Sequence, residues 1–122
     1  MQLSNNFIYE NAYKLYNLFN NNEQYIPIKL NFILRKNIQT LMNYIEQINA
    51  GRQAIGMQYG IPTEDGGFNV PAEKIDEVNK ELTDLGNIVQ EVSIQTIKFN
   101  EIDENIKLTP QQMEAIMFMI EE

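Results

Sequence analysis

Apolar residues recur between Leu34 and Tyr59 at alternating spacings of four and three, and this row constrains the fold more than any other feature of the sequence. Such spacing places the side chains on one face of an α-helix, along which a partner helix can pack lengthwise. With Pro27 in the first turn, the row predicts a helix over 28–59, about 45–50 Å long at 1.5 Å per residue. The row consists of Leu34, Ile38, Leu41, Ile45, Ile48, Arg52, Ile55 and Tyr59.

A second row with the same spacing follows and predicts a partner for the first. It indicates a third helix over 71–89, which begins near Pro71. Two matched rows separated by a short connector predict an antiparallel helical hairpin. Gly51 and Gly56 weaken the long helix, unless they let a neighbouring segment approach closely. The second row consists of Ile75, Val78, Leu82, Leu85 and Val89.

The connector between the two rows, residues 59–71, is rich in turn formers. Asp65-Gly66 is a turn signal, and the apolar residues Ile61 and Phe68 flank it. The connector therefore forms either a small β-hairpin or an irregular loop.

Further helices are expected at both ends of the chain. Ser4 is the expected N-cap of a helix over 5–20, which an Asn-rich run ends. Thr109 and Gln112 form the pattern of a capping box, which predicts a helix over 110–122. The inner face of the first helix consists of Ile8, Ala12, Leu15 and Phe19.

One segment, residues 92–100, changes to the period-two alternation of a β-strand. Its partner is left open between residues 1–4, residues 68–70 and a strand of another chain. The expected fold is mainly α and a single domain over 1–122. A long antiparallel helical hairpin is flanked by N- and C-terminal helices, with one short β-strand.

The absence of Cys, His and Trp excludes several classes of function. Disulfide frameworks, thiol nucleophiles, Ser-His-Asp triads and Cys/His zinc sites cannot be built without these residues. The glycines do not form a phosphate-binding loop or a dinucleotide fingerprint. We therefore expect no enzymatic activity, no cofactor and no metal.

The charge is distributed unevenly along the chain. Residues 1–60 carry a net charge of +2 and residues 61–122 a net charge of −10, which gives −8 overall. This balance argues against nucleic acid or an anionic membrane as a direct partner. One helix face is expected to gather acidic side chains, as a solvated surface or as a mimic of phosphates. This acidic face consists of Glu73, Glu77, Glu81 and Asp84.

Two apolar surfaces are candidates for binding a protein partner. Tyr9, Tyr13 and Tyr16 line one face of the first helix, either as the edge of the core or as a contact surface. In the last helix, Phe118 and Met119 lie off the inner face and either are buried or meet another chain.

Arg52 is the one charged member of the long row. It is expected either to form a structural ion pair with Glu77 and Glu81, or to extend along its aliphatic stem to water. The N-terminus lacks the pattern of a signal peptide, and the longest apolar run, Ala115–Ile120, is too short to span a bilayer. A soluble, intracellular protein is expected.

Several short strings resemble parts of small acidic proteins encoded in phages and prophages of Gram-positive bacteria. They are IPIKLNFILRKNIQTL, GRQAIGMQYGIPTEDGG, EVSIQTI and LTPQQMEAIMFMIEE. The resemblance covers about residues 26–122 and implies a viral origin, in the cytoplasm of a host bacterium or in the virion. Because those proteins have no assigned function, the resemblance supplies no active-site residues.

The expected function is therefore that of a non-enzymatic phage protein that acts by protein–protein interaction. An assembly factor, an adaptor or a minor virion component would fit, and the partner includes a second copy of the chain in a homo-oligomer. The alternative is an acidic inhibitor of a host nucleic-acid enzyme or defence system, which acts by phosphate mimicry.

Overall fold

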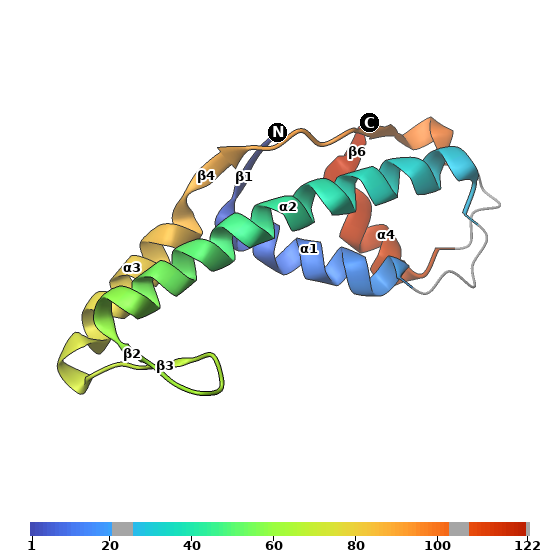
Figure 1. The fold of residues 1–122 in the computed structure, drawn as a ribbon. Coiled ribbons are helices and arrows are strands. Elements are labelled where there is room, and N and C mark those ends of the chain that lie inside the picture. Colours follow the sequence, from blue (N-terminus) through green and yellow to red (C-terminus); the bar gives the residue numbers. More distant parts are fainter. Residues whose placement is uncertain (21–25, 103–107, 122) are drawn as a thin grey trace.

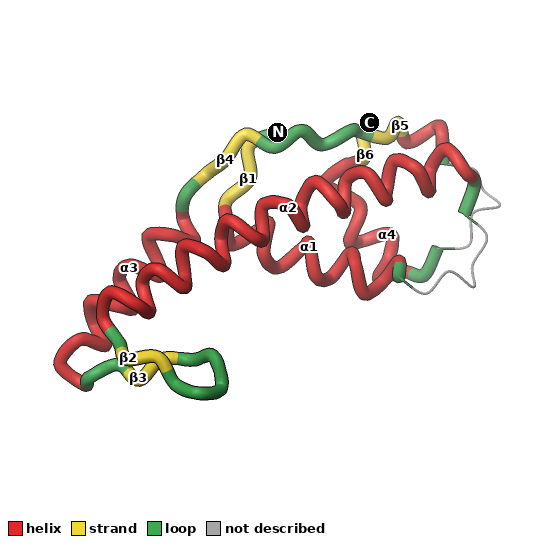
Figure 2. Tube along the Cα trace, in the orientation of Figure 1, coloured by secondary structure: helices red, strands yellow, loops and turns green. Residues whose placement is uncertain are grey.

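A computed structural model of the chain describes residues 1–20, 26–102 and 108–121. The described residues form four α-helices, α1 (Asn5–Phe19), α2 (Ile28–Tyr59), α3 (Ile75–Asn87) and α4 (Pro110–Ile116), with a few short strands (Figures 1 and 2). The prediction of a mainly helical fold is confirmed, and α2 has the predicted bounds. The Asn-rich run expected to end the first helix lies mostly outside the described residues.

The core lies between α1, the N-terminal half of α2, and α4. α1 lies against α2 and α4 (Figure 1). Ser4 caps α1 as predicted, since its hydroxyl accepts a hydrogen bond from the backbone N–H of Phe7 at 3.1 Å. The apolar row of α2 as far as Ile48 is buried here. The N-terminal half of α2 thus buries its row mainly through α1, whereas the sequence assigned α3 as its partner. The enclosed members from α1 and α4 are Ile8, Ala12, Leu15, Phe19, Ala115 and Ile116.

The C-terminal part of α2 leaves this core and is accompanied by α3, which runs back beside it (Figure 1). We call residues 50–87 the arm. Gly51 lets α3 approach, because a Cβ atom there would lie 3.1 Å from a methyl group of Leu85. The row of α3 is only partly covered, and Ile75 remains 45% exposed. Val89, the last predicted member of that row, begins a strand instead of extending the helix.

The tip of the arm is a β-hairpin, as one of the two interpretations of the sequence predicted. Strands β2 (Ile61–Pro62) and β3 (Phe68–Asn69) are antiparallel, with Ile61 opposite Asn69. Gly66 has a φ of +86° in the turn, a conformation that side chains disfavour. Phe68 lies so close to Gly56 that a Cβ atom there would be 2.8 Å from its ring carbon Cγ. The absence of a side chain at Gly56 thus permits the β-hairpin to fold onto α2.

The predicted single strand over 92–100 is wrong. β4 (Val89–Glu91) precedes that segment and pairs antiparallel with β1 (Gln2–Ser4), one of the candidate partners. β5 (Ile97–Lys98) pairs in parallel with β6 (Ile120–Glu121), which the sequence did not indicate. The residues between β4 and β5 form no ladder. We call residues 88–98, which run along α2 between these two pairings, the strap (Figure 1).

A buried amide explains why the strap is irregular in the middle. The Asn37 side chain is fully buried, and its Nδ2 donates to the Gln95 carbonyl at 2.9 Å. Its Oδ1 accepts from the Gln95 N–H, also at 2.9 Å. One side chain of α2 thus replaces a neighbouring strand for this residue. The Tyr44 hydroxyl donates to the Glu91 carbonyl at 3.0 Å and holds the strap at a second point.

The last helix begins as predicted but ends early. Thr109 and Gln112 form the complete capping box. The helix stops at Ile116 and not at Glu122, and the chain tightens into a 3₁₀ turn over Met117–Met119 before β6. The cause is the parallel pairing with β5, which requires an extended backbone at Ile120–Glu121.

Candidate functional site

The three tyrosines of α1 flank its buried face, at spacings of four and three. Tyr9 is half-buried, whereas Tyr13 is 38% and Tyr16 is 45% exposed. The rings of Tyr9 and Tyr13 meet edge to face, with centroids 5.3 Å apart and an interplanar angle of 68°. Tyr13 and Tyr16 of this predicted contact surface are therefore accessible, and the ring of Tyr9 packs against that of Tyr13.

A row of mostly polar residues on α2 runs beside the tyrosines. Tyr13 and Tyr16 share with it a hollow of about 470 Å³ between α1 and α2. We call the tyrosines and this row the tyrosine groove. Its α2 members are separated by four and three residues, so the groove follows the helix axis for about 27 Å. They are Arg35, Gln39, Met42, Glu46, Asn49 and Gln53.

Arg52 closes the groove at the end nearest the arm. Its guanidinium carbon lies 5.2 Å from the centre of the Tyr9 ring, in the position of a cation–π contact. Two hollows meet at this pair. The smaller, about 470 Å³, lies between α1 and α3 and includes Asn5, Glu10 and Leu85 in its lining.

The larger of the two hollows, about 590 Å³, extends from Tyr9 and Arg52 to the β-hairpin of the arm. Its walls are mainly half-buried apolar side chains. They come from α2 and α3 and from the end of the β-hairpin, and they are Ile55, Phe68, Val70, Val78 and Leu82. Asn49 and Gln53 supply amides at its α2 side. A single charged residue, Arg52, is found among the described residues that line it.

The structure corrects the predicted ion pair of Arg52. Within the described ranges, Arg52 makes no ion pair with Glu77 or Glu81. Its guanidinium lies instead over the Tyr9 ring of α1. The sequence contained a weak signal for the contact between Arg52 and Tyr9, because it places a cation in the apolar row of one helix and tyrosines beside the apolar face of another. It did not show which helix would face Arg52.

The acidic face of α3 lies beside the end of α2. Glu73, Glu77, Glu81 and Asp84 are all exposed. Lys74 partly offsets Glu77, with its Nζ 3.7 Å from a carboxylate oxygen. Desolvation, together with the negative charges of Glu81 and Glu77, raises the pKa of Tyr59 above its ordinary value. These carboxylates thus influence the last turn of α2.

Two of the predicted partner-binding residues are not available as a surface. Met119 is fully buried, and Phe118 is half-buried with its ring 5.1 Å from that of Phe7, edge to face. The reason is the early end of α4 at Ile116, after which the 3₁₀ turn directs Met119 into the core. Met117 is the exposed residue of this turn, at 61%.

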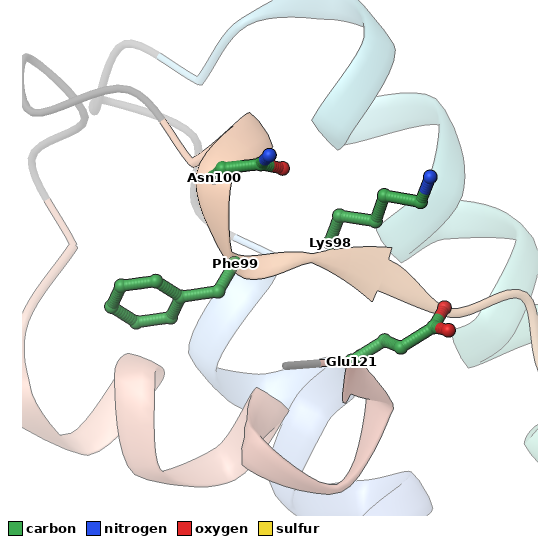
Figure 3. A pocket seen from close by; sticks show the side chains of 4 residues that line it. All are labelled: Lys98, Phe99, Asn100 and Glu121. Atoms are coloured by element: carbon green, nitrogen blue, oxygen red, sulfur yellow. The ribbon is translucent and has the colours of Figure 1, made fainter.

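Another hollow, of about 640 Å³, lies where β5 meets β6. Lys98, Phe99, Asn100 and Glu121 line it, and Phe99 points away from Lys98 and Glu121 (Figure 3). The four side chains drawn in Figure 3, those of the described lining residues, do not converge on a common point.

Two titratable groups of the described residues, Tyr59 and Asp65, have a shifted pKa. Among the described residues, no group of three carboxylates is placed to hold a metal ion. Asp65 has a lowered pKa because the Thr63 hydroxyl and the Gly67 N–H donate to its carboxylate, and these contacts shape a turn. No described helix is both long and apolar enough to cross a membrane.

No known protein family, curated protein or solved structure matches this chain. The features of the molecule that bear on its function are therefore the tyrosine groove and the hollows around Arg52.

Proposed function

We propose that this chain is a non-enzymatic protein of phage origin that acts by binding another protein. An assembly factor, an adaptor or a minor virion component would act in this way, in the host cytoplasm or in the virion. The phage origin is supported by the strings quoted above, and the mode of action by the tyrosine groove.

The observation that carries the proposal is the exposure of Tyr13 and Tyr16 beside a hollow between two packed helices. Tyrosine and arginine are enriched at protein interfaces, because each combines a large contact area with hydrogen-bonding groups. Asn and Gln on the opposite wall supply further donors and acceptors that adapt to a partner. Because the two helices pack through their buried faces, the groove is held in shape before binding.

The arm gives this surface a second wall. We propose that α2 and α3 act as an antiparallel helical hairpin, which holds the β-hairpin at a fixed position beside the groove. The close contacts at Gly51 and Gly56 support this interpretation, since each brings a segment of the arm against α2.

Site-specific photocrosslinking in the host cell tests the proposal. A photoreactive phenylalanine analogue at Tyr16 should form a discrete covalent adduct with a partner, identified by mass spectrometry. The matched control carries the same analogue at Gln47, which is exposed on α2 outside the groove. Adducts that are absent at Tyr16, or identical at both positions, would contradict the proposal.

Self-association is the version of this proposal in which the partner is a second copy. Light scattering over a wide concentration range measures it directly. A dimer that Tyr13→Ala and Tyr16→Ala weaken together would support it, whereas a monomer at every concentration would leave a different protein as the partner.

The alternative function is inhibition of a host nucleic-acid enzyme by phosphate mimicry. The acidic face of α3 favours it, as does the charge of −10 in residues 61–122. Exposed carboxylates on other elements, such as Glu64, Glu91 and Glu114, weigh against it, because they spread the charge over the molecule. Binding to purified nucleases at low salt would favour inhibition, provided that Glu77→Gln with Glu81→Gln abolishes it.

A further inference from the structure

Among the described residues, Arg52 has no anionic partner, and it lies where two hollows meet. Within the described residues, its one specific contact is the Tyr9 ring, and it has no ion pair there. Its side chain is exposed. A guanidinium that lies over a ring still presents its N–H groups at its edge, where they suit the two oxygens of a carboxylate.

The apolar surroundings of Arg52 favour a ligand that also carries an apolar group. In the larger hollow, Arg52 is the single charged residue of the described lining, and Phe68, Val78 and Leu82 are half-buried walls. In the smaller hollow, Glu10 is also present but makes no ion pair with Arg52 within the described residues. The larger hollow therefore joins one positive charge to an apolar surface.

We propose that the larger hollow binds a segment of a partner protein that presents a carboxylate side chain next to a large apolar side chain. The carboxylate pairs with Arg52, and the apolar side chain contacts Phe68 and Leu82. This inference rests on the proposed function and names the chemistry of the partner.

Charge complementarity favours an acidic and apolar protein segment over a nucleic acid or a second copy of the chain. A nucleic acid would carry its phosphates past the acidic face of α3, which repels them. A second copy would bring together two chains of charge −8. A short acidic and apolar segment avoids both costs, because it places one negative charge at one arginine.

Selection from a random peptide library tests the proposal, with the whole protein immobilised. The enriched sequences should carry Asp or Glu within two positions of Phe, Tyr, Trp or Leu. A synthetic peptide of the enriched sequence should bind in calorimetry and should lose affinity when its acidic residue is changed to the amide.

The variants that decide the question are Arg52→Gln and Arg52→Lys. Arg52→Gln should weaken binding about tenfold or more, since a hydrogen bond to a charged group contributes about 1.5–3 kcal/mol. Arg52→Lys should recover only part of the loss, because it keeps the charge without the planar fork. Lys36→Gln is the matched control, since it removes one exposed positive charge on α2 outside the hollow.

Three results would overturn the proposal: no enriched peptide, enriched peptides without an acidic residue, or equal affinity of Arg52→Gln and the unaltered protein. Circular dichroism establishes that each variant is folded. The photocrosslink at Tyr16 is measured independently. If that adduct forms while peptide selection fails, the proposed function holds and the assigned chemistry of the partner does not.

Discussion

At the scale of single residues, three buried amides join segments that lie far apart in the chain. Asn37 pairs with Gln95, as described above. The Asn5 side chain donates to the Leu85 carbonyl at 2.8 Å, and the Gln112 side chain donates to the Leu18 carbonyl at 2.8 Å. Each amide therefore donates to a backbone carbonyl of a distant segment, and Asn37 bonds both backbone groups of Gln95.

Asn37→Leu should destabilise the protein by about 1–3 kcal/mol, because both hydrogen bonds to Gln95 are lost and the strap is released at its centre. Urea denaturation followed by circular dichroism measures the change. Asn49→Leu, an exposed position on the same helix, should stay within about 0.5 kcal/mol. Equal effects of the two changes would show that the buried amide does not hold the strap.

The sequence did not indicate the burial of Asn37 or its contact with Gln95, and the reason is physical. Polar residues are usually exposed, and Asn37 lies next to the apolar row without belonging to it. Its burial depends on the position of Gln95, which is 58 residues away in the chain. No local pattern carries that information. By contrast, Ser4 and Thr109 act on residues of their own helix, so their roles as caps could be predicted.

Gly56→Ala should release the β-hairpin from α2, because the new methyl group would overlap the Phe68 ring. Gly51→Ala is the matched control. The new methyl group at position 51 would lie 3.1 Å from a methyl group of Leu85, so a small shift of the Leu85 side chain accommodates it. Methyl and amide NMR shifts of residues 61–70 report the release. Shifts of that segment that are equal for the two variants would contradict this role of Gly56.

At the scale of elements, the bounds of α2 were predictable, whereas the end of α4 and the pairing of β5 with β6 were not. The spacing of the α2 row is local, so it fixes where the helix begins and ends. The end of α4 at Ile116 depends on β5, which lies earlier in the chain and pairs with Ile120–Glu121. Likewise, Tyr13 and Tyr16 could be predicted as a surface from α1 alone, whereas the contact of Tyr9 with Arg52 required the packing of α1 on α2.

The contact between α2 and the acidic face of α3 predicts a pH effect. Desolvation and the charges of Glu81 and Glu77 raise the pKa of Tyr59 above 10.0, which favours its neutral form in the fold. The resulting contribution to stability is fully present below pH 10 and is lost as the pH rises through the raised pKa of Tyr59.

Glu81→Gln should lower the pKa of Tyr59, because one of the negative charges beside the phenol is removed. NMR titration of ¹³C-labelled tyrosine measures the pKa in the variant and in the unaltered protein. Glu114→Gln, on α4, is the control and should leave the titration of Tyr59 unchanged. An unchanged pKa in Glu81→Gln would mean that α3 does not lie beside Tyr59 in solution.

At the scale of the whole molecule, burial divides the chain into a well-packed part and the arm. All the buried apolar residues lie outside residues 50–87, and within that range only the glycines Gly56 and Gly86 are buried. A segment with few buried side chains opens at a lower free energy than the core does.

Backbone amides of α3 and of residues 50–59 should therefore exchange with deuterium faster than those of α1 and residues 30–48. Hydrogen exchange followed by mass spectrometry compares these regions within one sample. Exchange of the arm should slow when a partner occupies the groove, because Phe68, Val78 and Leu82 line its larger hollow. Uniform protection along α2 in the free protein would contradict this division.

The strap has a further consequence for synthesis. One end is held by β1, which leaves the ribosome early, and the other by β6, which leaves later than everything it touches. Ile116 and Met119 also complete the core. A nascent chain that has not yet exposed residues 116–121 should therefore leave apolar surface of α1 uncovered and be a target for chaperones. The emergence of residues 116–121 thus decides when this core can close.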